Sequence, residues 1–352
     1  VVMYRISDSV IHFFPSTMAL AIKYAIAHGC DVISLSHGGL PSRMLADAVN
    51  EAYENGTAIF AASGDFMQVP VLGWTTPETV VYPAAFDRVV AVCGATADKR
   101  SYGRSPGLMR LLFNWDLTQW MLRGSYGPDR CMHEAIAGYT PNVMWPRYTR
   151  DAPPNLLDLD GSGTSAATPQ AAAAAALWLE YHRDDPLLAG KWRSWEKVEA
   201  VYLALFDSAE KNTPEGGDSF KYFGRGLLKA RDALDLGVPK YMERRPEAKV
   251  GFGWLRLWSG FLPGVRSVSP AGDEAKHRAH SEMVCTELAQ LVYLSQDLQE
   301  LVTRQGIDPT GPQPPDEASM RTLLRAVAGH KHCSDYLRRV VQRALSAAGE
   351  TP

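Results

Sequence analysis

Gly163-Thr164-Ser165-Ala166-Ala167-Thr168-Pro169 is the stretch that most constrains the fold and chemistry of this chain. It places one serine at a glycine-flanked turn, and the alanine run from Ala171 to Ala176 that follows predicts a buried helix. The first N–H groups of a helix lack intrahelical partners and carry the positive end of its dipole, so they stabilise an anion formed beside Ser165. The motif therefore favours a nucleophilic serine and acyl transfer.

Two other interpretations of this motif compete with the nucleophile. In one, residues 161–163 are only a turn, Ser165 is only a helix cap, and the alanines only permit close packing. In the other, the glycines cradle a phosphate, but no lysine follows them as a P-loop requires, and we discount it. The choice between nucleophile and cap depends on the rest of the chain.

Apolar periodicity in the first part of the chain predicts strands that alternate with helices. In chain order, a strand, a helix, a strand, a helix and a strand are expected at Val1–Ile6, Thr17–His28, Val32–Leu35, Arg43–Glu54 and Ala58–Ala62. Such alternation predicts an α/β fold with a mostly parallel sheet covered by helices on both faces. Functional side chains are expected at the carboxyl ends of the strands, where residues 36–39 and Asp65 lie.

Four further segments resemble those of the subtilisin-like serine proteases in order and spacing. They are Asp-Val-Ile-Ser-Leu-Ser-His-Gly-Gly at 31–39, Thr-Ala-Ile-Phe-Ala-Ala-Ser-Gly-Asp at 57–65, Tyr-Pro-Ala-Ala-Phe-Asp-Arg-Val-Val-Ala-Val at 82–92 and Gly-Asp-Ser-Phe-Lys-Tyr-Phe-Gly-Arg-Gly-Leu-Leu at 217–228. The resemblance covers residues 1–237. It implies a three-layer α/β fold and a serine endopeptidase that forms an acyl-enzyme on Ser165. It also implies a peptide or protein substrate and favours a secreted or extracellular protein.

The resemblance assigns substrate binding to two strand ends and to the residue before the serine. These residues are Ser36, His37, Gly38, Gly39, Ser63, Gly64 and Thr164. The first four are expected to pair with a substrate backbone by strand addition, and their glycines leave room for side chains. Thr164 either adds a hydroxyl near the oxyanion or is a buried threonine satisfied by the backbone, and the sequence favours neither.

Asp65 departs from the family pattern, since most members carry asparagine there as an oxyanion-hole donor. An ionised carboxylate cannot donate a hydrogen bond and repels an oxyanion, whereas a protonated one can donate. The related sedolisins resemble this chain in carrying aspartate in that role at acidic pH. Either Asp65 is protonated in the working enzyme, or the hole relies on the backbone N–H of Ser165. A third interpretation makes Asp65 a turn residue.

The aspartate and histidine motifs of the family are not found in the sequence, which opens on Val1. We therefore expect the catalytic pair to be supplied by sequence ahead of Val1, and this chain alone to be inactive. His37 and His133 are the substitute bases considered within the chain, but each is more typical of a surface or satisfied core histidine. The alternative function is a catalytically inactive subtilisin-fold module that binds peptides or serves as a scaffold.

Composition excludes several other classes of protein. A net charge of -3 over 352 residues gives no electrostatic reason to bind nucleic acid. No apolar run approaches the length of a transmembrane segment. The five cysteines are too scattered for a disulfide framework or a zinc site, so neither a metal nor another cofactor is expected.

Three parts of the chain carry no resemblance to the family. Two of them lie beyond residue 237, where the composition changes. Residues 238–272 are expected to form a linker with an apolar patch at 250–263, and residues 273–352 a small helical domain. Its helices are expected at 281–304, 320–327 and 336–345, and this region is the candidate site for a protein partner. His330, His332 and Cys333 are metal-ligand candidates there, although a polar interhelical loop is favoured. Residues 104–123 are either an inserted flap or a loop pinned by tryptophans.

Overall fold

The computed structural model describes residues 1–6, 11–12, 15–69, 74–75, 79–103, 122–147, 156–252, 255, 271–309 and 313–347. These fall into two units, the first comprising Val1–Leu40 with Met44–Ala248 and the second Pro41–Arg43 with Lys249–Pro352. The expected insertion at 104–123 and the apolar patch at 250–263 lie largely outside the described residues.

A parallel sheet forms the centre of the first unit. Its strand order is β2 (Val32–Leu35), β4 (Ala58–Ala62), β7 (Val90–Ala95) and β9 (Ala135–Tyr139), and all three pairings are parallel. Every residue of β4 and β7 is buried, which explains why both strands are continuous apolar runs. The sheet confirms the α/β class expected from the sequence.

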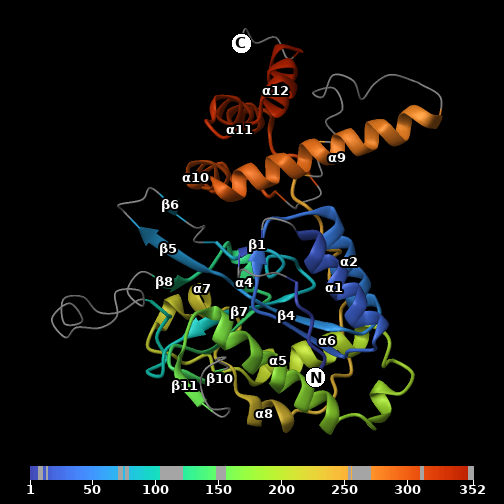
Figure 1. The fold of residues 1–352 in the computed structure, drawn as a ribbon, viewed down its shortest axis with the longest axis vertical. Helices are drawn as coiled ribbons and strands as arrows, with labels where there is room; N and C mark the ends of the chain where they lie inside the picture. The colour runs from blue at the N-terminus through green and yellow to red at the C-terminus, as the bar shows by residue number, and fades with distance from the viewer. Residues whose placement is uncertain are drawn as a thin grey trace, which may run out of the picture. The chain divides into compact units, whose positions relative to one another are not determined.

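Helices cover both faces of this sheet. Figure 1 shows α1 (Pro15–Ala27) and α2 (Arg43–Glu54) on one side of β4, and α5 (Thr164–Tyr181) on the other. The helix α6 (Trp195–Ser208) packs against α5. Three layers result, as the sequence predicted, and α5 lies against all four strands of the sheet.

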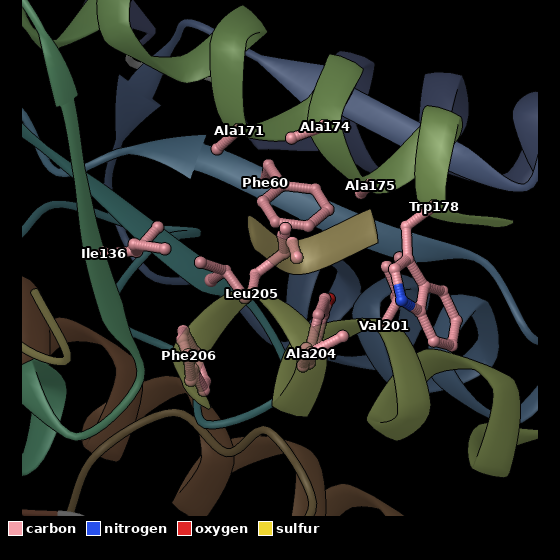
Figure 2. Close-up of a cluster of buried hydrophobic side chains, with 14 of the residues drawn as sticks. Phe60, Ile136, Ala171, Ala174, Ala175, Trp178, Val201, Ala204, Leu205 and Phe206 are labelled. Carbon is pink, nitrogen blue, oxygen red and sulfur yellow. The ribbon is translucent and has the colours of Figure 1, made fainter. Parts of the chain in front are cut away.

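Small side chains bring α5 close to the sheet. Ala171, Ala174 and Ala175 are at most 3% exposed and lie around the ring of Phe60 from β4, with Leu205 of α6 beside it (Figure 2). Such close packing leaves no room for larger residues, and an added side chain in a well-packed core costs about 1–3 kcal/mol. The alanine run therefore fixes the distance between the helix that begins at Thr164 and the strands.

Short elements complete the first unit around this core. They are β1 (Ile11–His12), β3 (Gly38–Gly39), β5 (Asp65–Val69), β6 (Trp74–Thr75), β8 (Leu122–Gly124), α4 (Asp129–Met132), β10 (Val143–Arg147), β11 (Leu156–Gly161), α7 (Ser219–Phe223) and α8 (Ala230–Leu234). The strand β3 pairs in parallel with β1, β5 pairs antiparallel with both β6 and β8, and β10 pairs antiparallel with β11. Two of these strands, β3 and β5, follow β2 and β4 in the chain, respectively, after two intervening residues.

The strand expected at residues 1–6 is wrong, because the structure assigns no regular element there. Val1, Val2 and Met3 are exposed, and among the described residues no strand pairs with them. An apolar run forms a strand only where a neighbour satisfies its backbone and covers its side chains.

The second unit is helical. Its helices are α9 (Ala271–Leu294), α10 (Gln296–Arg304), α11 (Glu317–Gly329) and α12 (Asp335–Ala347). The single helix expected at 281–304 is divided at Ser295, and Leu288, Leu323 and Leu337 lie in the buried core of this unit. A protein partner for the unit stays a prediction.

The first unit does not end where the family resemblance ends, because residues 244–248 are bound to it by a buried ion-pair network. The guanidinium of Arg245, 9% exposed, pairs with Glu134 and, at 2.9 Å, with Glu199, which is 4% exposed. It also lies over the ring of Tyr202, 4.7 Å from its centroid. We call residues 244–248 the strap. Through Arg245, the strap places a positive charge in the interior of the first unit.

Backbone hydrogen bonds hold the rest of the strap. The buried Arg88 donates from Nε to the carbonyl oxygen of Pro246 at 3.0 Å and pairs with Glu54 at 2.9 Å. The side chain of Asn50 donates to the carbonyl oxygen of Ala248 at 3.0 Å and accepts from its N–H at 2.8 Å. Residues 244–248 are therefore a structural part of the first unit.

Replacement of Arg245 by alanine is expected to lower the free energy of unfolding by about 3–5 kcal/mol, because it leaves the buried Glu199 and the partly buried Glu134 without their cation. Arg244, half exposed and paired with Glu54, is the matched control, and Arg244→Ala is expected to cost at most about 1 kcal/mol. Urea unfolding followed by tryptophan fluorescence measures both. Equal effects of the two changes would contradict a special role for the buried guanidinium.

Candidate active site

The loop before α5 positions the serine motif. Gly163 caps the helix with φ +77°, a conformation that favours glycine, and a Cβ there would lie 2.5 Å from Oδ2 of Asp65. Both constraints require glycine at this position. Ser165 follows in the first turn of α5 and is partly exposed.

The first N–H groups of α5 have different partners. The Thr164 N–H donates to the carboxyl of Asp65, 2.9 Å from Oδ1 and 3.2 Å from Oδ2, and the Ala166 N–H donates to the carbonyl oxygen of Gly163. Between them, the Ser165 N–H has no partner within the described part of the chain. It is the donor that the helix start offers to an anion beside the serine.

Ser165 and Ser36 exchange two hydrogen bonds. The Ser36 hydroxyl donates to the carbonyl oxygen of Ser165 at 2.8 Å, and the Ser165 hydroxyl donates to the carbonyl oxygen of Ser36 at 3.4 Å. The Ser165 carbonyl lacks its usual donor four residues later, because that residue is Pro169, which has no N–H. The proline thus makes this carbonyl available to Ser36 and joins α5 to the end of β2.

Ser63, Gly64 and Thr164 form a second connection between β4 and α5. The Thr164 hydroxyl accepts from the N–H of Gly64 at 3.2 Å and is fully buried. Ser63 donates through its hydroxyl to the carbonyl oxygen of Ser125 at 2.9 Å. The Thr164 hydroxyl is also hydrogen-bonded to the carboxyl of Asp65, so both of its predicted roles stay open.

The predicted substrate edge already has neighbours on both sides. In β3, Gly38 is paired with Ile11 and Gly39 with His12 of β1, and the Gly39 N–H donates to the carbonyl oxygen of Tyr82 at 2.8 Å. A peptide that pairs with the backbone of β3 must therefore displace β1.

Neither histidine considered as a base is hydrogen-bonded to Ser165 in the described structure. His37 lies between β2 and β3 and is partly buried. The ring of His133 lies 4.9 Å from that of Phe220, and its carbonyl oxygen accepts from Arg225. Both remain candidates from the sequence alone.

Burial changes the acidity of Asp65. Removal from water raises the pKa of its carboxyl to about 6 from an ordinary value of 3.8, although the hydrogen bond from the Thr164 N–H opposes this shift. A carboxylic acid here can accept from Thr164 through one oxygen and donate through the other. The site thus favours the protonated form of Asp65 at mildly acidic pH.

Other classes of site find no support in the part of the chain that the structure describes. No group of three or more histidine, cysteine, aspartate or glutamate side chains there could hold a metal ion. His330 instead lies 3.5 Å from Asp297, with the ring of His332 beside it. None of the helices is both long and apolar enough to cross a membrane, as judged over the same residues.

Three residues of this region lie outside the predicted set, namely Ser125, Pro169 and Val81, whose N–H donates to the carbonyl oxygen of Ser63 at 2.8 Å. Pro169 was detectable, because its distance of four residues from Ser165 identifies the carbonyl that loses a donor. Ser125 and Val81 come from segments distant in sequence from the motif, and no local pattern connects them to it.

Asp65→Asn is expected to stabilise the protein above pH 6. The folded pKa of Asp65 exceeds the unfolded one, so stability from its proton is complete below about pH 4 and is lost as the pH rises through about 6. The variant should be more stable by up to about 3 kcal/mol at pH 8, with little difference at pH 4. Thermal unfolding across this pH range measures it.

Asp65→Ala is the matched control, because alanine removes the charge but also the acceptor for the Thr164 N–H. It should be less stable than Asp65→Asn at every pH, by about 1 kcal/mol. Parallel stability curves for the wild-type protein and Asp65→Asn would contradict the buried, proton-binding carboxyl.

Solved structures that match part of this chain have low sequence identity to it. The structure of the prenylagaramide maturation protease PagA is 21% identical, with a TM-score of 0.44, and the match covers 65% of this chain and 70% of that one. Fervidolysin from Fervidobacterium pennivorans is 19% identical, with a TM-score of 0.41, and the match covers 64% of this chain and 29% of that one.

Sequence comparison gives a more specific result. The minor extracellular protease Epr of Bacillus subtilis (strain 168) is 31% identical over 157 residues, or 44% of this chain and 19% of that protein. The chain thus spans about a fifth of the length of this curated relative. A family model described as the subtilase family matches residues 12–226. Since this match covers more than half of the sequence, the chain belongs to the subtilase family.

Proposed function

We propose that this chain carries the nucleophile and the oxyanion hole of a serine endopeptidase. The observation that supports this most is the position of Ser165, a partly exposed residue at the start of α5 whose N–H has no partner among the described residues. In the proposed reaction, the Ser165 oxygen attacks the carbonyl carbon of a peptide bond, and its proton passes to a base. The acyl-enzyme forms when the amine leaves with that proton, and water then hydrolyses it.

The oxyanion of the tetrahedral intermediate would accept hydrogen bonds from the Ser165 N–H and from protonated Asp65. The carboxylic acid keeps its contact with the Thr164 N–H through one oxygen while its other oxygen donates. If Asp65 is ionised instead, the Ser165 N–H acts alone and the rate is low. These two forms of the oxyanion hole lead to different pH dependences of the reaction rate.

The base is proposed to be a histidine oriented by an aspartate, both from outside residues 1–352. This fits the described structure, in which the Ser165 hydroxyl donates to a backbone carbonyl and not to an imidazole. The chain by itself is then inactive.

The substrate is proposed to be a peptide or protein whose backbone pairs with residues 36–39 after β1 moves aside. Ser63, Gly64 and Thr164 would lie on the opposite side of the scissile carbonyl. Epr is named an extracellular protease, and we propose the same location for this protein.

A catalytically inactive peptide-binding or scaffold module is the second candidate function. It is favoured by the contacts of β3, which already has β1 on one side and Tyr82 on the other. Such a module needs no base, and it would keep the fold while Ser165 served only as a helix-start residue.

Serine-directed fluorophosphonate labelling of the complete protein distinguishes the two functions. The wild-type protein and Ser162→Ala, a matched change in the same loop, should be labelled, whereas Ser165→Ala should not. Labelling that is absent from all three proteins at acidic and neutral pH would favour the inactive module.

The pH dependence of peptide hydrolysis tests the role of Asp65. If the protonated acid is the donor, kcat/KM should fall about tenfold per pH unit once the pH rises above about 6. Asp65→Asn, whose amide donates at any pH, should abolish this loss and raise kcat/KM at pH 8. If kcat/KM of the wild-type protein stays constant from pH 5 to pH 8, protonated Asp65 is not the donor and the Ser165 N–H acts alone.

A further inference from the structure

The hydroxyl group of Thr164 connects two polar groups of the site. Thr164 is fully buried, and its hydroxyl oxygen accepts from the Gly64 N–H at 3.2 Å. The same hydroxyl is hydrogen-bonded to the carboxyl of Asp65. A backbone N–H can only donate, so the hydroxyl oxygen is the acceptor in the first bond and its one hydrogen is left for the second. The Thr164 hydroxyl therefore donates to Asp65.

Thr164 thus gives the Asp65 carboxyl two donors. The first is its backbone N–H, 2.9 Å from Oδ1 and 3.2 Å from Oδ2, and the second is its hydroxyl. Because Thr164 is fully buried whereas Asp65 is partly exposed, both donors reach the carboxyl from the interior of the protein. Neither donor occupies the exposed side of the carboxyl.

This arrangement decides which oxygen of a protonated Asp65 holds the proton. The oxygen that bears the hydrogen is the weaker acceptor of a carboxylic acid, so two donors on the interior side favour the carbonyl form of the oxygen there. The hydrogen then lies on the other oxygen, which an oxyanion beside Ser165 can reach. The Thr164 hydroxyl, whose hydrogen is already used, does not itself donate to that oxyanion.

We propose that Thr164 is a positioning residue that directs the acidic proton of Asp65 toward the oxyanion. The inference rests on the proposed function, because it takes protonated Asp65 as a donor of the oxyanion hole. Both Thr164 donors also favour the ionised carboxylate. The residue therefore orients the acid and at the same time narrows the pH range in which the acid exists.

Other charges do not set the protonation of Asp65 in the described structure. Burial is the largest cause of its raised pKa, and the two hydrogen bonds from Thr164 are the causes that oppose it. The helix α5 carries no charged side chain before Glu180, and β4 carries none. Arg123 of β8 lies opposite Phe66 in the strand register and is exposed. After burial, the two Thr164 donors are thus the groups that control this carboxyl.

Thr164→Val removes the hydroxyl and keeps the shape of the side chain. The folded pKa of Asp65 should rise by about one pH unit, because the ionised form loses one of its two donors. Carbon-13 NMR of the complete protein, labelled at its aspartate carboxyl carbons, measures this pKa. The signal that is absent from Asp65→Asn identifies Asp65. Thr164→Ser, which keeps the hydroxyl, should restore the wild-type pKa.

Peptide hydrolysis is the second readout. At pH 5, kcat/KM of Thr164→Val should fall by at least about tenfold, because Asp65 is still protonated but its proton is no longer directed. The decrease of kcat/KM that the wild-type protein shows above about pH 6 should move upward by about one pH unit. A site that is merely loosened would lose activity without this movement.

Thr168→Val is the matched control. Thr168 is also fully buried and lies one turn further along α5, but its hydroxyl donates to the Thr164 carbonyl oxygen at 2.8 Å. This variant should leave the pKa of Asp65 and the pH dependence unchanged. Thr164→Cys keeps a weak donor in the same space and should raise the pKa by less than Thr164→Val does. Thermal unfolding checks that each variant is folded.

An Asp65 pKa that is unchanged or lower in both Thr164→Val and Thr164→Cys would overturn the inference. So would a fall in kcat/KM without the upward movement in pH, since the hydroxyl would then act on the oxyanion directly. The NMR titration requires no hydrolysis, and fluorophosphonate labelling requires no particular pKa of Asp65. The inference and the proposed function can therefore fail separately.

Discussion

The hydrogen bond from the Thr164 N–H to the Asp65 carboxyl joins the end of β4 to the start of α5, and the geometry of the site depends on it. The contact is possible only because Gly163 has no side chain. It also gives the carboxyl two competing preferences. As an ion, Asp65 is the better partner for the positive helix start, whereas as an acid it can donate to an oxyanion. Its burial shifts the balance toward the acid.

The position of Ser165 depends equally on residues that contribute no polar group. Alanines along α5 let the helix approach the sheet, and Pro169 leaves the Ser165 carbonyl to Ser36. The polar contacts of the site are short-range and would not form if the helix lay further from the strands. The hydrogen bonds at the edge of the first unit therefore depend on the close packing of α5 against the sheet at its centre.

Much of this arrangement could be predicted from the sequence, and the remainder could not, for physical reasons. The strands Val32–Leu35 and Ala58–Ala62 and the helix Arg43–Glu54 were predicted with their observed bounds, because local apolar patterns specify them. The prediction that both strands are buried is correct for Ala58–Ala62 and wrong for Val32–Leu35, in which only Leu35 is buried. Residues 1–6 have a similar apolar pattern but form no strand, since pairing depends on a neighbour. The contacts of Arg245 and of Val81 join segments far apart in the chain, and no local pattern reports them.

The strap has a consequence for the covalent continuity of the chain. Residues 238–243 connect it to the rest of the first unit, and Tyr241 there is 91% exposed. A cut in this connection would break the polypeptide, but the guanidinium of Arg245 and the amide pairs of Asn50 would remain in place. The two fragments of a nicked molecule would then stay together until a denaturant separated them. A molecule that behaves as a single particle in solution could therefore contain a cut polypeptide.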